Sequence, residues 1–285
     1  MKVGDYDASR QSLVTYVGIK APCDTPPRSS FAHDLAFTKN WMVIFESSVQ
    51  FDKTKILSRN ESVLAFQRQV PMRIGFIPRQ ESSSSGPDRV VWIDAVTPHA
   101  LVHALNAWEE KDGTVVLWSP VGDDFDGDID TGVNMFLMTE FRMNPRTWQL
   151  INKKLVDSKY NIEFPRIRDD CLGRFCQFGY AGILDKDAFF MGFTVWDMEN
   201  GKLILKAVYY PEGEAGGEPV VIPEPGRSES IILIMFCLQW TTWSSKESDC
   251  AYVGNCCKSL TLIRRGQKND STVTLGNKLK HSFSN

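Results

Sequence analysis

Two histidines carry the clearest chemical signal in this sequence. The chain of 285 residues contains four histidines, and two of them, His33 and His103, begin short and unusual segments. His33 opens the segment His-Asp-Leu-Ala-Phe-Thr, and His103 opens His-Ala-Leu-Asn-Ala-Trp-Glu-Glu. A histidine taken alone is more often a hydrogen-bonded structural residue than a ligand. Because neutral imidazole is the commonest protein ligand for transition metals, the two segments together predict that His33 and His103 bind one metal ion.

The elements expected to position these histidines are short strands. Runs of β-branched and aromatic residues are separated by turn residues, which is typical of an antiparallel all-β protein. The pair Asn200-Gly201 predicts a tight hairpin, because such a turn requires positive φ. Successive hairpins must close or stack their sheets to protect the edges, and a propeller with four-stranded blades or a sandwich would do so. The expected strands cover residues 41–45, 90–94, 114–118, 135–143, 189–197 and 202–210.

The composition excludes several classes of protein. A hydrophobic fraction of 42% with 11% aromatic residues is typical of a folded globular chain. A net charge of -3 leaves no basic stripe for phosphate contacts, so we exclude nucleic-acid binding. The longest apolar run, Ile231 to Leu238, is too short to span a bilayer, and we recognise no signal peptide. Seven cysteines, an odd number, suit free thiols in a reducing compartment, so we expect a soluble intracellular protein.

Some segments interrupt the strand pattern and offer weaker chemical signals. The acidic residues 124–128 resemble a calcium loop in composition, but Met135 stands where the bidentate glutamate of such a loop belongs. Cys250, Cys256 and Cys257 lack the paired spacing of a metal site, so we interpret them as incidental thiols. We expect solvated loops at the Pro-rich residues 22–27, at residues 80–87 and at the acidic residues 123–130.

Six segments resemble, in the same order, those of the carotenoid cleavage dioxygenase family, also called carotenoid oxygenases. Residues 31–41 are similar to the family's His-Asp-Phe-Ala segment, and residues 103–110 are similar to its His-x-x-Asn-Ala-Trp-Glu-Glu segment. The others are Arg-Ile-Gly-Phe-Ile-Pro-Arg at 73–79, Glu-Phe-Pro-Arg-Ile at 163–167, Gly-Arg-Phe at 173–175 and Gly-Gly-Glu-Pro-Val at 216–220. The resemblance covers residues 2–234.

The resemblance implies a fold, a cofactor and an activity. The fold would be a seven-bladed β-propeller, incomplete in this chain, with iron(II) held on its axis by histidines that include His33 and His103. Glu218 would accept a hydrogen bond from a ligating imidazole. The reaction would be oxidative cleavage of a conjugated double bond of a carotenoid or apocarotenoid by O2, giving aldehyde or ketone products. The expected compartment is the plastid or cytoplasm, with peripheral membrane contact as an option and the oligomeric state open.

The chain departs from the family pattern at both ends. Two of the four family histidines are missing, because the segments that carry them are absent. His99 is expected in a loop or at the surface, and His281 is a weak candidate ligand within a divergent tail. We expect residues 1–236 to form a partial propeller domain and residues 237–285 to be poorly ordered. Our hypothesis is that two ligands hold iron weakly and support slow turnover at most.

Two kinds of alternative stay open. Within enzymes, the chain could act on a stilbene-type phenylpropanoid or isomerise and hydrolyse a retinyl ester, because the sequence does not reveal the shape of the substrate tunnel. Outside enzymes, it could be a non-catalytic β-domain that binds a carotenoid or a partner protein and has lost the metal site. The missing histidines favour the non-catalytic β-domain, whereas the joint presence of His33, His103 and Glu218 favours an enzyme.

Overall fold

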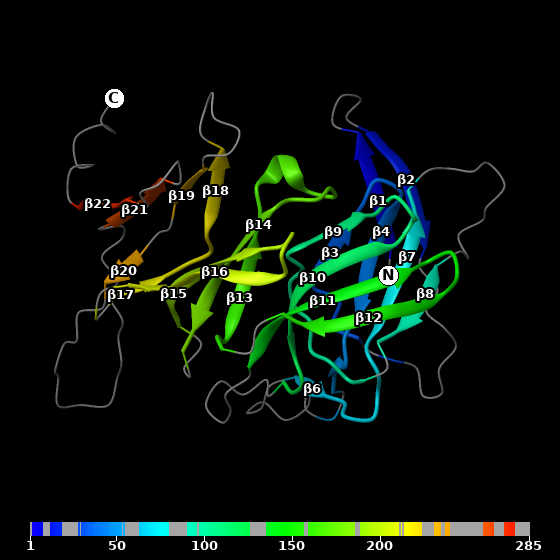
Figure 1. Cartoon of the computed structure of the whole chain (residues 1–285). Coiled ribbons are helices and arrows are strands. Elements are labelled where there is room, and N and C mark those ends of the chain that lie inside the picture. The colour runs from blue at the N-terminus through cyan, green and yellow to red at the C-terminus, as the bar shows by residue number, and fades with distance from the viewer. Residues whose placement is uncertain are drawn as a thin grey trace. The chain divides into compact units, whose positions relative to one another are not determined.

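Figure 1 shows a computed structural model of the whole chain. The residues that the structure describes are 2–7, 12–18, 28, 30–52, 54, 63–79, 90–95, 97–125, 135–156, 159–185, 189–210, 212, 214–223, 231–234, 237–239, 259–264 and 271–276. The chain divides into two compact units. Unit 1 is Met1–Lys159 with Leu172–Phe175, and unit 2 is Tyr160–Cys171 with Cys176–Asn285.

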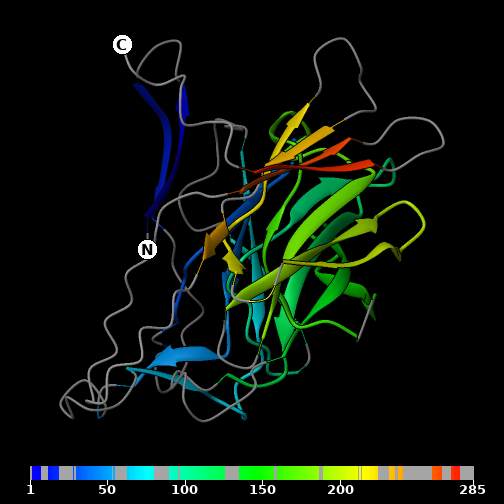
Figure 2. The same cartoon turned by 90° about the vertical axis from the view of Figure 1, so that its left-hand side faces the viewer.

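Unit 1 contains two four-stranded antiparallel sheets. The first has the strand order β3-β4-β7-β8, and the second has the order β12-β11-β10-β9. Their strands are β3 (Leu35–Phe37), β4 (Trp41–Glu46), β7 (Arg73–Pro78), β8 (Val91–Asp94), β9 (Asn106–Glu109), β10 (Val115–Gly122), β11 (Phe136–Asn144) and β12 (Gln149–Leu155). Two hairpins accompany them, β1 (Lys2–Asp7) with β2 (Ser12–Gly18) and β5 (Val49–Phe51) with β6 (Leu64–Phe66). In both views β10 and β11 (green) run side by side (Figures 1 and 2). Four-stranded antiparallel sheets are the unit from which a propeller is built.

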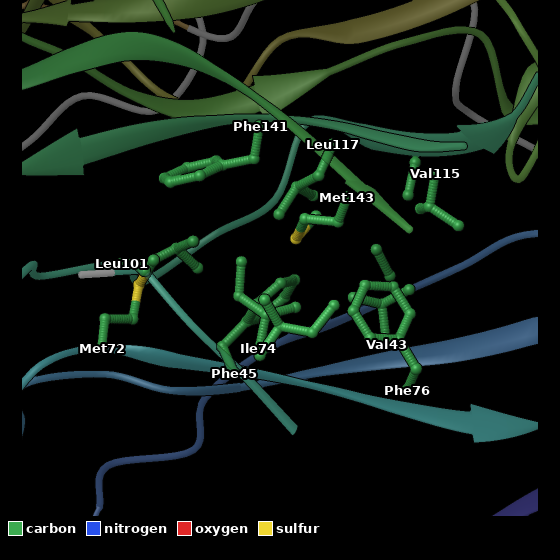
Figure 3. Packing of buried hydrophobic residues seen from close by; sticks show 14 of the residues in the cluster. Val43, Phe45, Met72, Ile74, Phe76, Leu101, Val115, Leu117, Phe141 and Met143 are labelled. Carbon is green, nitrogen blue, oxygen red and sulfur yellow. The ribbon is translucent and has the colours of Figure 1, made fainter. Parts of the chain in front are cut away.

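The main core cluster of unit 1 takes every second residue of its strands, and the residues between them are also buried, on the opposite face. Successive side chains of a strand point to opposite faces, so every second residue can face the core. Val43 with Phe45 and Ile74 with Phe76 show this period, and all four side chains are buried. Figure 3 shows these side chains packed against those of the second sheet, which come from Val115, Leu117, Phe141 and Met143. Burial of each such side chain contributes roughly 1.5 to 3 kcal/mol, so this cluster holds together the two sheets whose edge strands, β3 and β9, follow His33 and His103.

Unit 2 is also built from antiparallel strands. One sheet has the order β13-β14-β15-β17-β20, with β16 also paired to β15, and the other has the order β18-β19-β21-β22. The strands are β13 (Ile162–Arg166), β14 (Phe178–Leu184), β15 (Phe190–Asp197), β16 (Lys202–Tyr209), β17 (Glu214–Gly216), β18 (Val220–Pro223), β19 (Ile231–Ile234), β20 (Cys237–Gln239), β21 (Ser259–Arg264) and β22 (Ser271–Gly276). A short 3-10 helix, η1 (Asp169–Cys171), follows β13.

The hairpin predicted at Asn200-Gly201 is confirmed. Asp197 at the end of β15 pairs with Lys202 at the start of β16, and Gly201 has a φ of 58°. Glycine adopts this left-handed conformation without the clash that a Cβ would cause. The carboxylate of Asp197 accepts hydrogen bonds from the backbone N–H groups of Glu199 (3.1 Å) and Asn200 (3.2 Å), which closes the turn.

The prediction of an all-β chain is confirmed, and each of the six expected strands is present. Their bounds agree to within about one residue, except that β10 continues to Gly122. Cys171 and Cys176 are free thiols, as expected. The expected loops at residues 22–27 and 80–87, and most of the loop at 123–130, lie outside the described residues. Beyond residue 236 the structure places strands β20, β21 and β22, so these parts are not without regular structure, and the boundary at 237 stays a prediction.

Candidate metal centre

His33 and His103 lie next to each other, although 69 residues separate them in the sequence. Their ring centroids are 4.9 Å apart, and the ring planes make an angle of 80°. His33 precedes β3 and is exposed, whereas His103 precedes β9 and is partly buried. The two strands are edge strands of different sheets in unit 1. The structure therefore brings together the two residues that the sequence singles out as ligands.

The separation of the two rings fits joint binding of one metal ion. With metal–nitrogen distances of about 2.1 Å and ligand–metal–ligand angles between about 90° and 109°, the centroids of two bound imidazoles would lie roughly 4.6 to 5.3 Å apart. The observed 4.9 Å lies inside that range. Within the described residues, no group of three or more histidine, cysteine, aspartate or glutamate side chains is placed to hold a metal. The donors that fit are therefore the pair of imidazoles.

His99 belongs to a separate polar cluster. It lies in a loop, as expected, but its side chain is 2% exposed, so the alternative of a surface position is wrong. Its Nδ1 lies 2.9 Å from the Asp123 carboxylate, and its Nε2 contacts the Thr97 hydroxyl at 2.6 Å and the Lys153 ammonium. Burial, and next the positive charge of Lys153, lower the pKa of His99 below its ordinary value. His281 lies outside the described residues.

Two carboxylates join the segments that carry His33 and His103. Asp34, the neighbour of His33, accepts a hydrogen bond at Oδ2 from the backbone N–H of Ala104, the neighbour of His103, at 2.9 Å. Glu109, at the end of β9, accepts three hydrogen bonds from the segment after β3. They come from Thr38 Oγ1 (2.5 Å), the Asn40 backbone N–H (2.7 Å) and Asn40 Nδ2 (2.7 Å). Each segment thus supplies a carboxylate that binds the other segment.

The environment of Glu109 favours its charged form. Burial alone would raise the pKa of this carboxyl group, but the hydrogen bonds from Thr38 and Asn40 outweigh it and hold the pKa below the ordinary value. Hydrogen bonds to the ionised form of an acid act in this direction. Glu109 therefore remains an acceptor for all three donors at neutral pH.

A third segment found in the sequence, Gly-Arg-Phe at 173–175, packs against the other two. The side chain of Asn106 accepts a hydrogen bond from the Gly173 N–H (3.1 Å) and donates one to the Arg174 carbonyl (2.7 Å). The rings of Phe175 and Trp108 meet edge to face at 5.5 Å. These five residues all belong to unit 1, and the segment packs against β9 through Asn106 and Trp108.

The segment at 73–79 also contacts the first histidine segment. Arg79 donates a hydrogen bond to the Thr38 carbonyl (2.8 Å), and its guanidinium lies over the Phe37 ring at 5.1 Å. At the other end of β7, Arg73 donates from Nε to Glu46 at 2.9 Å inside the protein. Segments that are far apart in the sequence therefore support one another around β3 and β9.

Glu218 lies in unit 2, where it pairs with an arginine. Its Oε1 is 2.6 Å from Arg166 Nη2, and its side chain is 42% exposed. Arg166 belongs to the Glu-Phe-Pro-Arg-Ile segment, so this ion pair joins two segments of the predicted set. The role of Glu218 toward an imidazole stays a prediction.

The sequence reasoning missed Asp34, Asn106 and Glu109 as individual residues of the site. The signal that could have identified them is position: a carboxylate directly follows His33, and an amide and a carboxylate follow His103 within six residues. Small polar side chains beside candidate ligands are the ones able to fix backbone geometry there.

Comparison with known proteins identifies the family. The sequence model of the retinal pigment epithelial membrane protein family matches residues 2–250. The chain belongs to this family.

Curated relatives are carotenoid cleavage dioxygenases. The chain is 29% identical over 209 residues to the chloroplastic 9-cis-epoxycarotenoid dioxygenase NCED6 of Arabidopsis thaliana, covering 70% of this chain and 34% of the relative. It is 27% identical over 230 residues to the chromoplastic zeaxanthin 7,8(7',8')-cleavage dioxygenase of Crocus sativus, covering 76% of this chain and 61% of the relative. The chain thus spans less than two thirds of the length of either relative.

Solved structures share the fold. An ACO/RPE65 chimera superposes with a TM-score of 0.69 at 18% identity, over 92% of this chain and 52% of the chimera. Cobalt-substituted Synechocystis ACO gives a TM-score of 0.68 at 18% identity, over 92% of this chain and 52% of that protein. The predicted carotenoid-oxygenase type of β-propeller fold is confirmed, and this chain accounts for about half of it. In the described part of the chain, no helix has the length and apolar character needed to cross a membrane.

Proposed function

We propose that this chain is part of a non-haem iron(II) dioxygenase that cleaves a conjugated double bond of a carotenoid or apocarotenoid with O2. The products would be aldehydes or ketones. The observation that carries the proposal is the contact between the rings of His33 and His103, 4.9 Å apart at their centroids. Family membership supports it, because the curated relatives are carotenoid cleavage dioxygenases, some of them chloroplastic or chromoplastic. The plastid is accordingly the proposed compartment.

His33 and His103 are proposed to hold the iron as neutral imidazoles. When bound, the iron would supply a place for O2 to bind and be activated beside an apolar substrate. Because neutral imidazoles do not neutralise the charge of the ferrous ion, the ion can still bind further ligands. Glu218 is proposed to accept the remote N–H of a ligating imidazole and so to fix its tautomer.

Aromatic side chains beside His33 suit a flat, apolar substrate. The Phe31 ring stacks on the His33 ring, with centroids 5.1 Å apart and planes 27° apart. Phe51 meets Phe31 edge to face at 5.9 Å, and its side chain is 42% exposed. Exposed aromatic faces next to a candidate ligand can bind a conjugated chain by burial of apolar surface.

The test is iron content and product formation by the 285-residue chain. After anaerobic loading with Fe2+, we expect wild-type protein to bind iron weakly and to release apocarotenoid products slowly from a carotenoid panel resolved by chromatography. His33→Ala and His103→Ala should each lose the iron and the products. His99→Gln removes a histidine outside the pair and should keep both. Retention of iron and cleavage by His33→Ala would refute the proposed site.

The second candidate is a non-catalytic β-domain that binds a carotenoid. It is favoured by the finding that the described residues gather a pair of imidazoles and no third donor of the histidine, cysteine or carboxylate type. In that case a carotenoid would bind wild type and His33→Ala with the same affinity, without iron and without products. Absorbance titration with the same carotenoid panel distinguishes the two candidates.

A further inference from the structure

Neither histidine lies within a strand, although the His103 carbonyl accepts a hydrogen bond from the Ser119 hydroxyl of β10 at 2.8 Å. His33 and His103 each stand before a strand rather than in one. The strands that follow, β3 and β9, are edges of different sheets, so no ladder of backbone hydrogen bonds joins them. The contact between the two rings therefore depends on interactions that link β3 to β9 by side chains.

The structure supplies such links at both ends of the two segments that follow the histidines. At the end next to the histidines, Asp34 Oδ2 accepts from Ala104 N–H at 2.9 Å, and Asp34 Oδ1 accepts from Leu35 N–H at 2.7 Å. The carboxylate thus fixes the residue after His33 to the residue after His103. A displacement of one histidine backbone relative to the other would have to break this hydrogen bond.

At the other end, Glu109 fixes the far ends of the same two segments. It holds Thr38 Oγ1 at 2.5 Å and both the backbone N–H and the side-chain amide of Asn40 at 2.7 Å. The Thr38 side chain is fully buried, and its hydroxyl also accepts a hydrogen bond from the Trp41 N–H at 3.0 Å. Hydrogen bonds to a charged acceptor are stronger than those between neutral groups, which makes a carboxylate the suitable residue here.

We propose that Asp34 and Glu109 are positioning residues that hold the His33 and His103 rings side by side for one metal ion. The inference rests on the proposed function for the metal, but the placement of the rings is a property of this chain alone. Neither carboxylate is proposed to touch the metal or the substrate. They act on the distance between two imidazoles whose residues precede the edge strands of two different sheets.

The matched control is the neighbouring glutamate. Glu110 follows Glu109 in the same segment, but it pairs with Arg142, whose Nη1 and Nη2 lie 2.8 and 2.7 Å from Glu110 Oε1. Glu110→Ala removes a carboxylate of the same segment without removing a link between β3 and β9. Glu109→Gln is the conservative variant, since it keeps one carbonyl acceptor and the shape of the side chain.

The first measurement is NMR of the imidazole groups in histidine-labelled protein without metal. Wild type should give a nuclear Overhauser effect between the rings of His33 and His103. Asp34→Ala and Glu109→Ala should lose this effect and shift both ring resonances, while the His99 resonances stay in place and report that the core is intact. Glu110→Ala should match wild type, and Glu109→Gln should recover part of the effect.

The second measurement is titration with Co2+, followed by the visible absorption of the bound ion. Loss of residues that orient ligands weakens metal binding by about 10-fold to 100-fold, and we expect losses of this size for Asp34→Ala and Glu109→Ala. Glu110→Ala should bind Co2+ as wild type does. If Asp34→Ala or Glu109→Ala does not fold, the comparison of Glu109→Gln with wild type gives the answer at reduced amplitude.

The outcomes separate this inference from the proposed function. If both alanine variants fold and keep the inter-ring effect and the wild-type affinity for Co2+, the positioning role is overturned. If wild type shows the inter-ring effect, lost in the variants, yet binds no Co2+, the positioning role stands and the metal function fails for this chain.

Discussion

Gly173 packs directly against Phe37, so closely that a Cβ atom placed on Gly173 would lie 2.9 Å from Cδ2 of the Phe37 ring. Gly173 also has a φ of 76°, a conformation that favours glycine. Its N–H donates to Asn106 at 3.1 Å. One glycine thus touches the segment of His33 and the segment of His103, and no larger residue could do so without moving one of them.

Gly173→Ala should destabilise unit 1 by about 2 to 3 kcal/mol, because the left-handed backbone and the contact with Phe37 both oppose a methyl group. Chemical denaturation monitored by tryptophan fluorescence measures the change. Gly113→Ala is the control, since Gly113 has a φ of 89° but its nearest neighbour, on Arg146, would lie 3.7 Å away. It should lose only about 1 kcal/mol. Equal losses for the two variants would mean that the Phe37 contact is easily relieved.

The buried ion pair of Arg73 and Glu46 gives a second prediction. The two side chains are 6% and 11% exposed, and Arg73 also lies over the Trp92 ring at 5.4 Å. Arg73→Met should destabilise the protein by up to about 3 to 5 kcal/mol, because it leaves the buried Glu46 carboxylate with only the more distant Arg28, at 3.9 Å, as a cationic partner among the described residues. The double variant Arg73→Met with Glu46→Leu should recover part of that loss, since it removes both charges. Urea unfolding of the two variants measures the difference. A double variant with a lower free energy of unfolding than Arg73→Met would contradict this reasoning.

The sequence predicts the strands of this chain well because runs of β-branched and aromatic residues bounded by turn residues are a local signal. Val43, Phe45, Ile74 and Phe76 lie in such runs and are buried in the core. The turn at Asn200-Gly201 was equally readable, because glycine at positive φ is a local requirement.

The site is only partly readable from the sequence. Residue type identifies His33 and His103. The hydrogen bonds of Asp34 and Glu109, in contrast, join residues 69 to 71 positions apart, and no local pattern encodes them. The burial of His99 was missed for the same reason. Its partners are Asp123, which directly follows β10, and Lys153, which lies within β12. Pairings across sheets depend on the completed fold.

From the lowered pKa of His99 we predict that the folded protein loses stability as pH falls. Its pKa is lower in the folded protein than the ordinary value of 6.5, because burial and Lys153 oppose the charged form. The unfolded chain therefore binds the proton more readily, so stability is complete above pH 6.5 and is lost as pH falls below it. The groups facing the ring are Asp123, Lys153 and Thr97, and Asp123 works in the opposite direction.

The measurement is the free energy of unfolding of wild type and His99→Gln at pH 8.0 and at pH 5.5. We expect wild type to lose more stability than His99→Gln between the two values, since glutamine does not titrate. Identical pH dependences for the two proteins would show that His99 has the same pKa in the folded and unfolded states.

Asp197 gives the corresponding prediction for an acid in unit 2. Burial works to raise the pKa of this carboxyl group, but hydrogen bonds from Asn200 and the Glu199 backbone outweigh it and hold the pKa below the usual 3.8. Its contribution to stability is therefore present above pH 3.8 and is lost as pH falls through the lower, folded-state value.

Asp197→Ala should destabilise the protein by about 1 to 3 kcal/mol at pH 7, because it removes the acceptor of the hydrogen bonds that close the β15–β16 hairpin. Glu199→Ala, which keeps the backbone N–H and removes only an exposed side chain, should stay within about 0.5 kcal/mol of wild type. Thermal unfolding of the three proteins at pH 7 and pH 3 tests both parts: the gap between wild type and Asp197→Ala should narrow at pH 3, and a gap of the same size at both pH values would show that the charge of Asp197 does not hold the turn.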